Sequence, residues 1–386
     1  MEKYAIGLMS GTSLDGIDGA LVKIEGAGIN TKVELLHFIN ETLPEEIKEE
    51  IKNCCSTDKS NVEAICSLNF RIGYLLSDTV KKLCREANFP YDKLDFIGSH
   101  GQTIFHIPRE YGKYIKSTLQ IGEPAIIAYE TGVTVVSNFR TMDIASGGQG
   151  APLVPYTEYL LYRSDKNRLL QNIGGIGNVT VIPANCDIDD IFAFDTGPGN
   201  MIIDEVVKTL KQLPYDKNGE FAKRGSIKEG LLKELLDLPY INLEPPKTTG
   251  RELFGKQFVD EVLRKWNAEK DEDIIATVTA FTAYSIAENY KRFIFPYHHI
   301  DEIIVGGGGS YNTTLINMLN TLLPDCKVLI QEDLGYSSDA KEAIAFAVLA
   351  NETLNGFEGN VIGATGAKER VILGNITPGK KYFRRE

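Results

Sequence analysis

An order of extended and helical segments that occurs twice along the chain constrains the fold more than any other feature of the sequence. Each half begins with three apolar, β-branched runs, and a Gly-rich turn separates the first run from the second. Helical patterns then alternate with further extended runs. The expected strands of the first half are 4–9, 20–25, 32–38, 96–99 and 133–138, with helices at 44–53, 61–87 and 123–130. Those of the second half are 168–173, 179–183, 191–194, 302–305 and 327–330, with helices at 201–211, 274–290, 311–322 and 339–349.

This order predicts an α/β fold with two lobes, each of the order βββαβαβ and each built on a mixed sheet. A chain of 386 residues is long enough for two lobes of ordinary size. We expect an N-terminal lobe at 1–145 and a C-terminal lobe at 146–386, with the extreme C-terminus left free to return to the first lobe. The Gly-rich run at 143–152 lies at this boundary. It suits a flexible linker and a loop that lines a cleft equally well.

Charge and composition exclude several classes of protein. The net charge is −12, and this acid excess argues against nucleic-acid or anionic-membrane partners. The six cysteines form no CxxC pair, so a zinc site is not expected. No run of 18 apolar residues and no signal-type N-terminus is present, and we therefore expect a cytoplasmic protein. A homodimer is left open.

A turn of small residues joins the first two expected strands, in the run MSGTSLDGID at 9–18. Backbone N–H groups and hydroxyls in such a turn can form a concavity that binds phosphate. Asp15 and Asp18 supply hard oxygen ligands for Mg²⁺, directly or through water. An ordinary Asp-Gly hairpin turn explains the same residues, and both interpretations stay open. The residues small enough for close approach to a polyphosphate are Gly11, Thr12, Ser13 and Gly16.

Two further glycine motifs occur in the second half. The run NIGGIGNV at 172–179 occupies the place that the first turn has in the first half, and the two turns could grip the β- and γ-phosphates of ATP from opposite sides. Its candidate residues are Gly174, Gly175, Gly177 and Asn178. The run VGGGGSYN at 305–312 places Gly306, Gly307, Gly308 and Gly309 after a buried strand. Four glycines cost conformational entropy, so we expect adenine or ribose to approach bare backbone there. The absence of GxxxxGK[ST] excludes a P-loop protein.

An aspartate ends the third strand of the second half, in FDTGPGN at 194–200. Asp195 is therefore placed as a base in a cleft, although a cap or turn role explains it too. Asn200 is expected to cap the helix that follows.

Polar groups also follow strands of the first half, where the ends of α/β strands face ligands. His100, Gln102 and Thr103 suit sugar hydroxyls and amides, and Arg140 suits a carboxylate. Lys247 and Arg251, in PPKTTGRE, are further cationic candidates, and a solvated loop explains them equally well.

The motifs together resemble the anhydro-N-acetylmuramic acid kinase family, within the actin–hexokinase superfamily. The resemblance runs from about residue 4 to the C-terminal VILGNI, and only 210–243 is hard to place. The motifs that carry it are MSGTSLDGID, GSHGQT, QIGEPAIIA, NFRTMDIASGGQGAPLVP, NIGGIGNVT, FDTGPGN, PPKTTGRE, VGGGGSYN and EAIAFA.

The resemblance implies a two-lobed actin/hexokinase-like fold with ATP and substrate in a cleft between the lobes. It implies a phosphotransferase of peptidoglycan recycling that uses ATP and water to convert 1,6-anhydro-N-acetylmuramic acid into N-acetylmuramic acid 6-phosphate. Asp195 would be the general base, with Mg²⁺ and the glycine turns at the phosphates. Substrate contacts are implied for His100, Gln102, Thr103, Arg140 and Glu342. ATP is implied at Ser10, Gly11, Thr12, Ser13, Leu14, Asp15 and Gly16.

Two other readings remain. The same fold supports chaperone ATPases and filament proteins, in which ATP drives conformational change. A kinase for an ordinary hexose or acetylated amino sugar is also compatible, with Asp195 deprotonating a hydroxyl instead of water.

Overall fold

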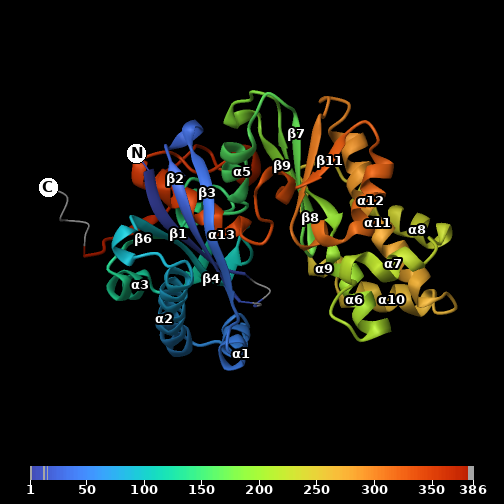
Figure 1. The fold of residues 1–386 in the computed structure, drawn as a ribbon. Helices are drawn as coiled ribbons and strands as arrows, with labels where there is room; N and C mark the ends of the chain where they lie inside the picture. The colour runs from blue at the N-terminus through green and yellow to red at the C-terminus, as the bar shows by residue number, and fades with distance from the viewer. Residues whose placement is uncertain (1, 12–13, 15, 381–386) are drawn as a thin grey trace. The chain divides into compact units, whose positions relative to one another are not determined.

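The structure, a computed structural model, describes residues 2–11, 14 and 16–380. Its contacts divide the chain into two compact units (Figure 1). Unit 1 contains Met1–Leu161 and Ala340–Glu386, and unit 2 contains Tyr162–Asp339.

The first division falls after Leu161, compared with the boundary at 145/146 expected from the sequence. Packing explains the difference. Helix α5 (Val154–Tyr162) follows the Gly-rich run, and the hydroxyl of Tyr156 donates to Oε2 of the buried Glu352 at 3.1 Å. Both residues belong to unit 1, so the chain leaves that unit only after α5. The segment from Ala340 onward also belongs to unit 1.

The sheet of unit 1 has the strand order β12-β6-β4-β1-β2-β3, with β5 paired to β4. Strands β1, β2 and β3 form an antiparallel meander, whereas β4 runs parallel to both β1 and β6. The bounds are β1 Glu2–Ser10, β2 Ile17–Glu25, β3 Lys32–Glu41, β4 Phe96–Ile107, β5 Ser117–Ile121, β6 Thr134–Ser137 and β12 Asn375–Thr377.

Helices cover both faces of this sheet. A Cβ on Gly7 would lie 1.7 Å from the carbonyl oxygen of Ala343, so α13 packs closely on one face. Leu8 points to the other face, because successive side chains of a strand alternate. There its cross-strand partner Gly19 lies against Leu83 of α2. The bounds are α1 Glu45–Cys54, α2 Val62–Glu86, α3 Pro124–Thr131, α4 Thr141–Ala145, α13 Lys341–Asn355 and α14 Ile362–Thr365.

Unit 2 repeats the strand arrangement, with the order β11-β10-β7-β8-β9. Again three antiparallel strands, β7, β8 and β9, come first. Strand β10 then pairs in parallel with β7, and β11 pairs in parallel with β10. The duplicated order expected from the sequence is confirmed. The bounds are β7 Arg168–Ile173, β8 Ile176–Ile182, β9 Phe192–Pro198, β10 Glu302–Gly306 and β11 Lys327–Ile330.

Two hydrophobic clusters share the long helix α11 of unit 2. One packs α11 and α12 on the sheet through residues such as Tyr290, Leu315 and Val305. The other packs α11 against the shorter helices and accounts for 210–243, the stretch that the sequence left unplaced. The bounds are α6 Asn200–Lys211, α7 Glu220–Arg224, α8 Glu229–Leu236, α9 Arg251–Phe254, α10 Lys256–Lys265, α11 Asp271–Phe293 and α12 Thr313–Leu322.

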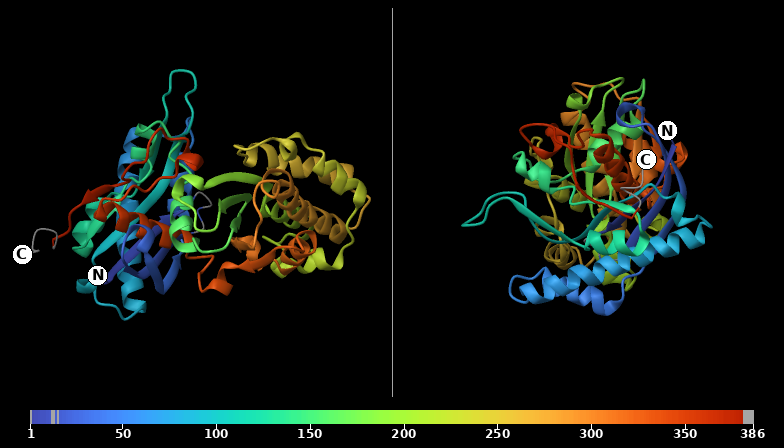
Figure 2. Two further views of the ribbon diagram at one scale, coloured as in Figure 1. Left: turned by 90° about the horizontal axis from the view of Figure 1, so that it is seen from above. Right: turned by 90° about the vertical axis from the view of Figure 1, so that its left-hand side faces the viewer.

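The predicted strand at 96–99 is longer than expected. It continues to Ile107 because β5 pairs back on it, and Figure 2 shows the connecting turn extending away from the sheet of unit 1. Within the described part of the chain, no helix is long and apolar enough to cross a membrane.

Candidate active site

The turn between β1 and β2 holds the first group of expected phosphate ligands. Thr12, Ser13 and Asp15 lie outside the described residues. Ser10 is buried, and its hydroxyl donates to Oε1 of Gln102 at 2.6 Å. This bond joins Ser10, which was expected to contact ATP, to Gln102, which was expected to contact the sugar.

The remaining described residues of this turn are engaged in the hairpin. Leu14 adopts a left-handed φ of 61°, and its N–H donates to the carbonyl of Gly11 at 3.3 Å. A Cβ on Gly16 would lie 2.6 Å from the carbonyl oxygen of Glu41, so packing against β3 alone requires a glycine there.

The structure does not test the expected magnesium ligands, Asp15 and Asp18, as a pair. Oδ1 of Asp18 accepts a hydrogen bond from Nδ2 of Asn40 at 2.7 Å, and Asp15 is not described. Among the described residues, no group of three or more His, Cys, Asp or Glu side chains is placed to hold a metal ion. Mg²⁺ therefore stays a prediction.

His100 and Arg140 form a buried pair in unit 1. His100 lies on β4, and Arg140 precedes α4. Nε of Arg140 donates to Nε2 of His100 at 2.9 Å, and Nδ1 of His100 lies 2.8 Å from the carbonyl oxygen of Gly101. Nε2 accepts a hydrogen bond and so carries no proton, which assigns the proton to Nδ1. Burial, and then the charge of Arg140, lower the pKa of His100 to about 3. The imidazole is neutral, and both of its nitrogens are engaged within the protein.

The guanidinium of Arg140 is held at a second point. Its Nη1 donates to the carbonyl of Gly150 at 2.8 Å, while Nη2 has no hydrogen-bond partner among the described residues. Burial lowers the pKa of Arg140 to about 10, and the charges of Glu342 and Asp143 act in the opposite direction. Glu342, exposed in the first turn of α13, is thus near Arg140 although 202 positions separate them (342 − 140).

The side chains of Gln102 and Thr103 are bonded inside unit 1. Nε2 of Gln102 donates to the carbonyl of Thr103 at 3.1 Å, and the Thr103 hydroxyl accepts from Nε2 of Gln120 at 3.2 Å. Gln120 belongs to the motif QIGEPAIIA, but its place beside Thr103 was not predicted, because β5 itself was not expected.

The Gly-rich run at 143–152 is a fastened loop. Asp143 is fully buried, and its Oδ2 accepts from the N–H of Gly150 at 2.8 Å. Its Oδ1 accepts from Nδ2 of Asn360 at 2.8 Å and from the hydroxyl of Thr365 at 2.7 Å. These hydrogen bonds rule out a flexible linker, which was one of the two interpretations that the sequence left open for this run. Asp143, Asn360 and Thr365 had not been singled out, although Asp143 lies in the motif NFRTMDIASGGQGAPLVP.

In unit 2, the turn between β7 and β8 is fastened to the start of α6. The carbonyl of Gly174 accepts from the N–H of Asn200 at 2.7 Å, and that of Gly175 accepts from the N–H groups of Gly199 at 2.9 Å and Met201 at 3.1 Å. Asn200 is the first residue of α6 and does not cap it through its side chain, contrary to expectation. Its Nδ2 donates to the carbonyl of Ile173 instead, at 3.2 Å. These carbonyls face the helix, so any phosphate contact of this turn would use its N–H groups.

Asp195 lies on β9 beside this turn, with Asn178 as its cross-strand partner. Its Oδ2 accepts hydrogen bonds from the hydroxyl of Thr248 and from the N–H of Thr249, both at 2.9 Å. Gly177 is also close to β9, because a Cβ there would lie 2.8 Å from the Thr196 hydroxyl. Three of the predicted residues, Gly177, Asn178 and Asp195, are therefore brought together.

Packing within the protein explains most of the four-glycine run after β10. A Cβ on Gly306 would lie 2.6 Å from Gln331, and one on Gly309 would lie 2.3 Å from Ile173. Gly307 has a φ of +79°, and a Cβ there would lie 2.8 Å from Oδ1 of Asn172. Only Gly308 is exposed, with its nearest neighbour, Nδ2 of Asn200, at ordinary van der Waals distance. Packing therefore explains three of the four glycines without a ligand, and the expected contact of this run with adenine or ribose stays a prediction.

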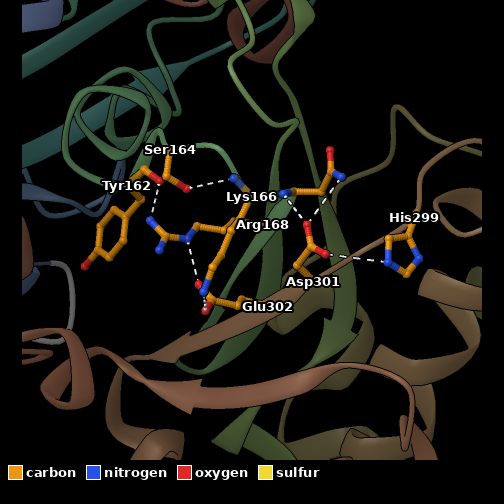
Figure 3. Close-up of polar contacts among 8 residues, drawn as sticks. Tyr162, Ser164, Lys166, Arg168, His299, Asp301 and Glu302 are labelled. Atoms are coloured by element: carbon orange, nitrogen blue, oxygen red, sulfur yellow. Dashed lines mark hydrogen bonds and ion pairs between the residues drawn. The ribbon is translucent and has the colours of Figure 1, made fainter.

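A charged network lies at the opposite ends of β7 and β10 from these glycine turns (Figure 3). Glu302 is buried and pairs with Lys166 and with Nε of Arg168, and Nη1 of Arg168 donates to the carbonyl of Tyr162 at 2.8 Å. Burial raises the pKa of Glu302, but the two ion pairs outweigh it and hold the pKa below its usual value. The network therefore holds the chain where it enters unit 2, at the ends of β7 and β10 away from the glycine turns.

The βββαβαβ order, with a glycine turn between the first two strands, occurs in both units, and it defines the chain as an α/β protein with a duplicated fold. The anhydro-N-acetylmuramic acid kinase family model matches residues 3–379. The chain belongs to this family.

Curated relatives agree with the family model. The anhydro-N-acetylmuramic acid kinase of Clostridioides difficile (strain 630) is 59% identical over 377 residues, covering 97% of this chain and 98% of the relative. That of Bacillus thuringiensis subsp. konkukian (strain 97-27) is also 59% identical, covering 97% of this chain and 99% of the relative. Solved structures match more loosely. The activator of the 2-hydroxyisocaproyl-CoA dehydratase from Clostridium difficile, with bound ADPNP, is 11% identical over 91% of this chain and 96% of that chain, with a TM-score of 0.45.

Proposed function

We propose that this chain converts 1,6-anhydro-N-acetylmuramic acid, ATP and water to N-acetylmuramic acid 6-phosphate and ADP, as a step of peptidoglycan recycling. The observation that carries the proposal is the match to the family at 59% identity over 97% of the chain. Family membership makes the chain a kinase, that is, a phosphotransferase. The coupled opening of the anhydro ring and the roles of individual residues are what the proposal adds.

Asp195 is the general base in this proposal. Its carboxylate takes a proton from a water molecule whose oxygen forms a bond to C1 of the sugar. The C1–O6 bond breaks, and O6 then bonds to the γ-phosphorus of ATP while the bond from that phosphorus to the bridging oxygen breaks and ADP leaves. The proton held by Asp195 passes to solvent, so the reaction releases one proton. The two hydrogen bonds on Oδ2 support this role because they stabilise a charged carboxylate.

Arg140 binds the lactyl carboxylate of the substrate in this proposal. A guanidinium that is held at Nε by His100 and at Nη1 by Gly150 has a set orientation, which favours bidentate recognition of a carboxylate. His100 would act through Arg140 instead of touching the sugar, because the protein already uses both imidazole nitrogens.

The phosphates of ATP would meet backbone N–H groups of the β1–β2 and β7–β8 turns, and Gly308 would lie against the adenosine. A magnesium ion bound with ATP would neutralise charge on the transferred phosphoryl group, with Asp18 and Asp15 as the residues to hold it, directly or through water. The homodimer and the cytoplasmic location stay predictions.

Product analysis in ¹⁸O-water tests the proposal. Mass spectrometry should find one ¹⁸O atom at C1 of a phosphorylated sugar, and ATP turnover should depend on the anhydro sugar. Phosphorylation of an ordinary amino sugar without incorporation of label would favour the alternative in which Asp195 deprotonates a hydroxyl. ATP turnover that does not respond to any sugar would contradict both.

A further inference from the structure

We propose that the segment 239–250, here called the strap, is the positioning element for Asp195, and that the hydroxyl of Thr248 sets the orientation and acidity of its carboxylate. The inference rests on the proposed role of Asp195 as general base. It gives the PPKTTG motif a function, whereas the sequence suggested only cationic candidates or a solvated loop.

The strap contacts Asp195 at both its backbone and its side chain. The N–H of Asp195 donates to the carbonyl of Lys247 at 3.1 Å, and the carbonyl of Asp195 accepts from the hydroxyl of Tyr240 at 2.9 Å. Strand β9 is the edge strand of its sheet, so one side of its backbone has no neighbouring strand to pair with. The strap supplies these partners at the residue where the base lies.

The side-chain contacts converge on one oxygen. Thr248 donates through its hydroxyl and Thr249 through its backbone N–H, and both hydrogen bonds end on Oδ2 of Asp195. Two donors in different directions fix the plane of a carboxylate, so Oδ1 also takes a set direction. Donors to the charged form stabilise it relative to the protonated form. A base held in this way is oriented before the substrate arrives.

Lys247 anchors the strap. Only 8% of Lys247 is exposed, and its Nζ donates to the carbonyls of Tyr240 and Ile241, each at 3.3 Å. The same Nζ lies 5.1 Å from the ring centre of Tyr240 and 5.0 Å from that of Phe293 at the end of α11. Tyr240 therefore contacts the buried cation of Lys247 through its ring and the backbone of Asp195 through its hydroxyl. Phe293 of α11 packs against the same cation.

The two adjacent threonines provide a matched experiment. Thr248→Val removes the hydroxyl that donates to Asp195. Thr249→Val keeps the N–H donor and removes a buried hydroxyl that has no partner among the described residues. Thr248→Ser restores the donor. The titration midpoint of the Asp195 carboxyl is measured by ¹³C NMR of aspartate-labelled protein, with the resonance identified by its loss in Asp195→Asn. This readout requires no substrate.

We expect Thr248→Val to raise this midpoint by at least about half a pH unit, because a hydrogen bond to the charged form is lost. Thr249→Val and Thr248→Ser should keep the wild-type midpoint. In kinetics, Thr248→Val should lower kcat about tenfold, shift the acid limb of the pH profile in the same direction and leave KM for ATP unchanged. Thr249→Val, which removes a hydroxyl from the adjacent residue, controls for a general change of packing around the carboxylate.

Two results would overturn the proposal: a wild-type midpoint in Thr248→Val, or equal shifts in Thr248→Val and Thr249→Val. Failure of the proposed function has a different signature, since a wild-type enzyme that does not turn over the anhydro sugar leaves the NMR comparison intact. Lys247→Met tests the anchor separately. It should speed amide hydrogen exchange at Asp195 and Thr249, while exchange in β7 stays unchanged. Unchanged exchange at both amides in the folded variant would contradict the role of Lys247.

Discussion

The guanidinium of Arg140 is held by a neutral imidazole, because its Nε donates to Nε2 of His100 at 2.9 Å. Nε2 can accept this bond only without a proton, and the pKa of His100, lowered to about 3 by burial and by Arg140, keeps it so at neutral pH. The pair therefore acts as one unit that presents a fixed cation.

Arg140→Ala should raise KM for the anhydro-muramic substrate by about tenfold or more. A charge-assisted bidentate pair with the lactyl carboxylate is worth roughly 1.5–3 kcal/mol, and each 1.4 kcal/mol is about a factor of ten. Steady-state kinetics measure the change. An anhydro-N-acetylglucosamine analogue, which lacks the lactyl group, should respond much less, and Arg109→Ala, at an exposed position of the same unit, serves as the control. Equal losses of kcat on both sugars would assign Arg140 to the phosphate or the water instead.

His100→Gln should change how stability depends on pH. Unfolded His100 binds a proton below about pH 6.5, whereas the folded state does so only near pH 3, so the wild type loses stability as the pH falls through this window. Glutamine does not titrate. The stability advantage of the wild type over the variant should therefore shrink by roughly 1–2 kcal/mol between pH 7 and pH 5, measured by urea unfolding. His299→Gln, at an exposed imidazole, is the control. A constant difference across this range would mean that folded His100 accepts a proton.

Asp195→Asn should lower turnover at least about 10²-fold while ATP affinity is retained, because the base does not bind phosphate in the proposed mechanism. Asparagine keeps the size of the side chain and an oxygen that can accept from Thr248. Asp165→Asn, at an exposed position of the same unit, should leave turnover unchanged. Near wild-type turnover in Asp195→Asn would remove this residue from the mechanism.

Gly307→Ala and Gly308→Ala should separate packing from ligand contact. Gly307 has a φ of +79° and a close neighbour in Asn172, so alanine there should lower the free energy of unfolding by at least about 1 kcal/mol. Gly308→Ala should fold normally and weaken ATP binding, because its Cβ would point to the surface where we place the adenosine. Thermal unfolding and nucleotide titration measure the two effects. Unchanged ATP affinity in Gly308→Ala would move the nucleotide away from this turn.

Most element positions could be read from local patterns. The helix expected at 61–87 is α2, Val62–Glu86, where Asn61 caps the first turn and Leu68, Ile72 and Leu76 repeat every four residues. The strand expected at 168–173 has the same bounds as β7. The short strands β5 and β12 were not found. Strand β5 pairs with the part of β4 beyond residue 99, which was itself not expected, and β12 becomes a strand only by pairing with the distant β6. Glycine motifs were a weaker guide to ligand contacts, because close packing within the protein and close approach of a ligand both require glycine.

The sequence by itself determined the duplicated order of strands and helices and, through its motifs, the family. Hydrophobic period, caps and turn residues act within a few positions, so a single chain displays them directly. Only the tertiary structure decided that His100 is neutral beside Arg140, 40 positions away, and that Thr248 holds the carboxylate of Asp195 across 53 positions. Such hydrogen bonds depend on which chain segments lie side by side, and on burial that shifts the pKa of the groups involved. Neither is encoded in the spacing of residues along one strand or helix.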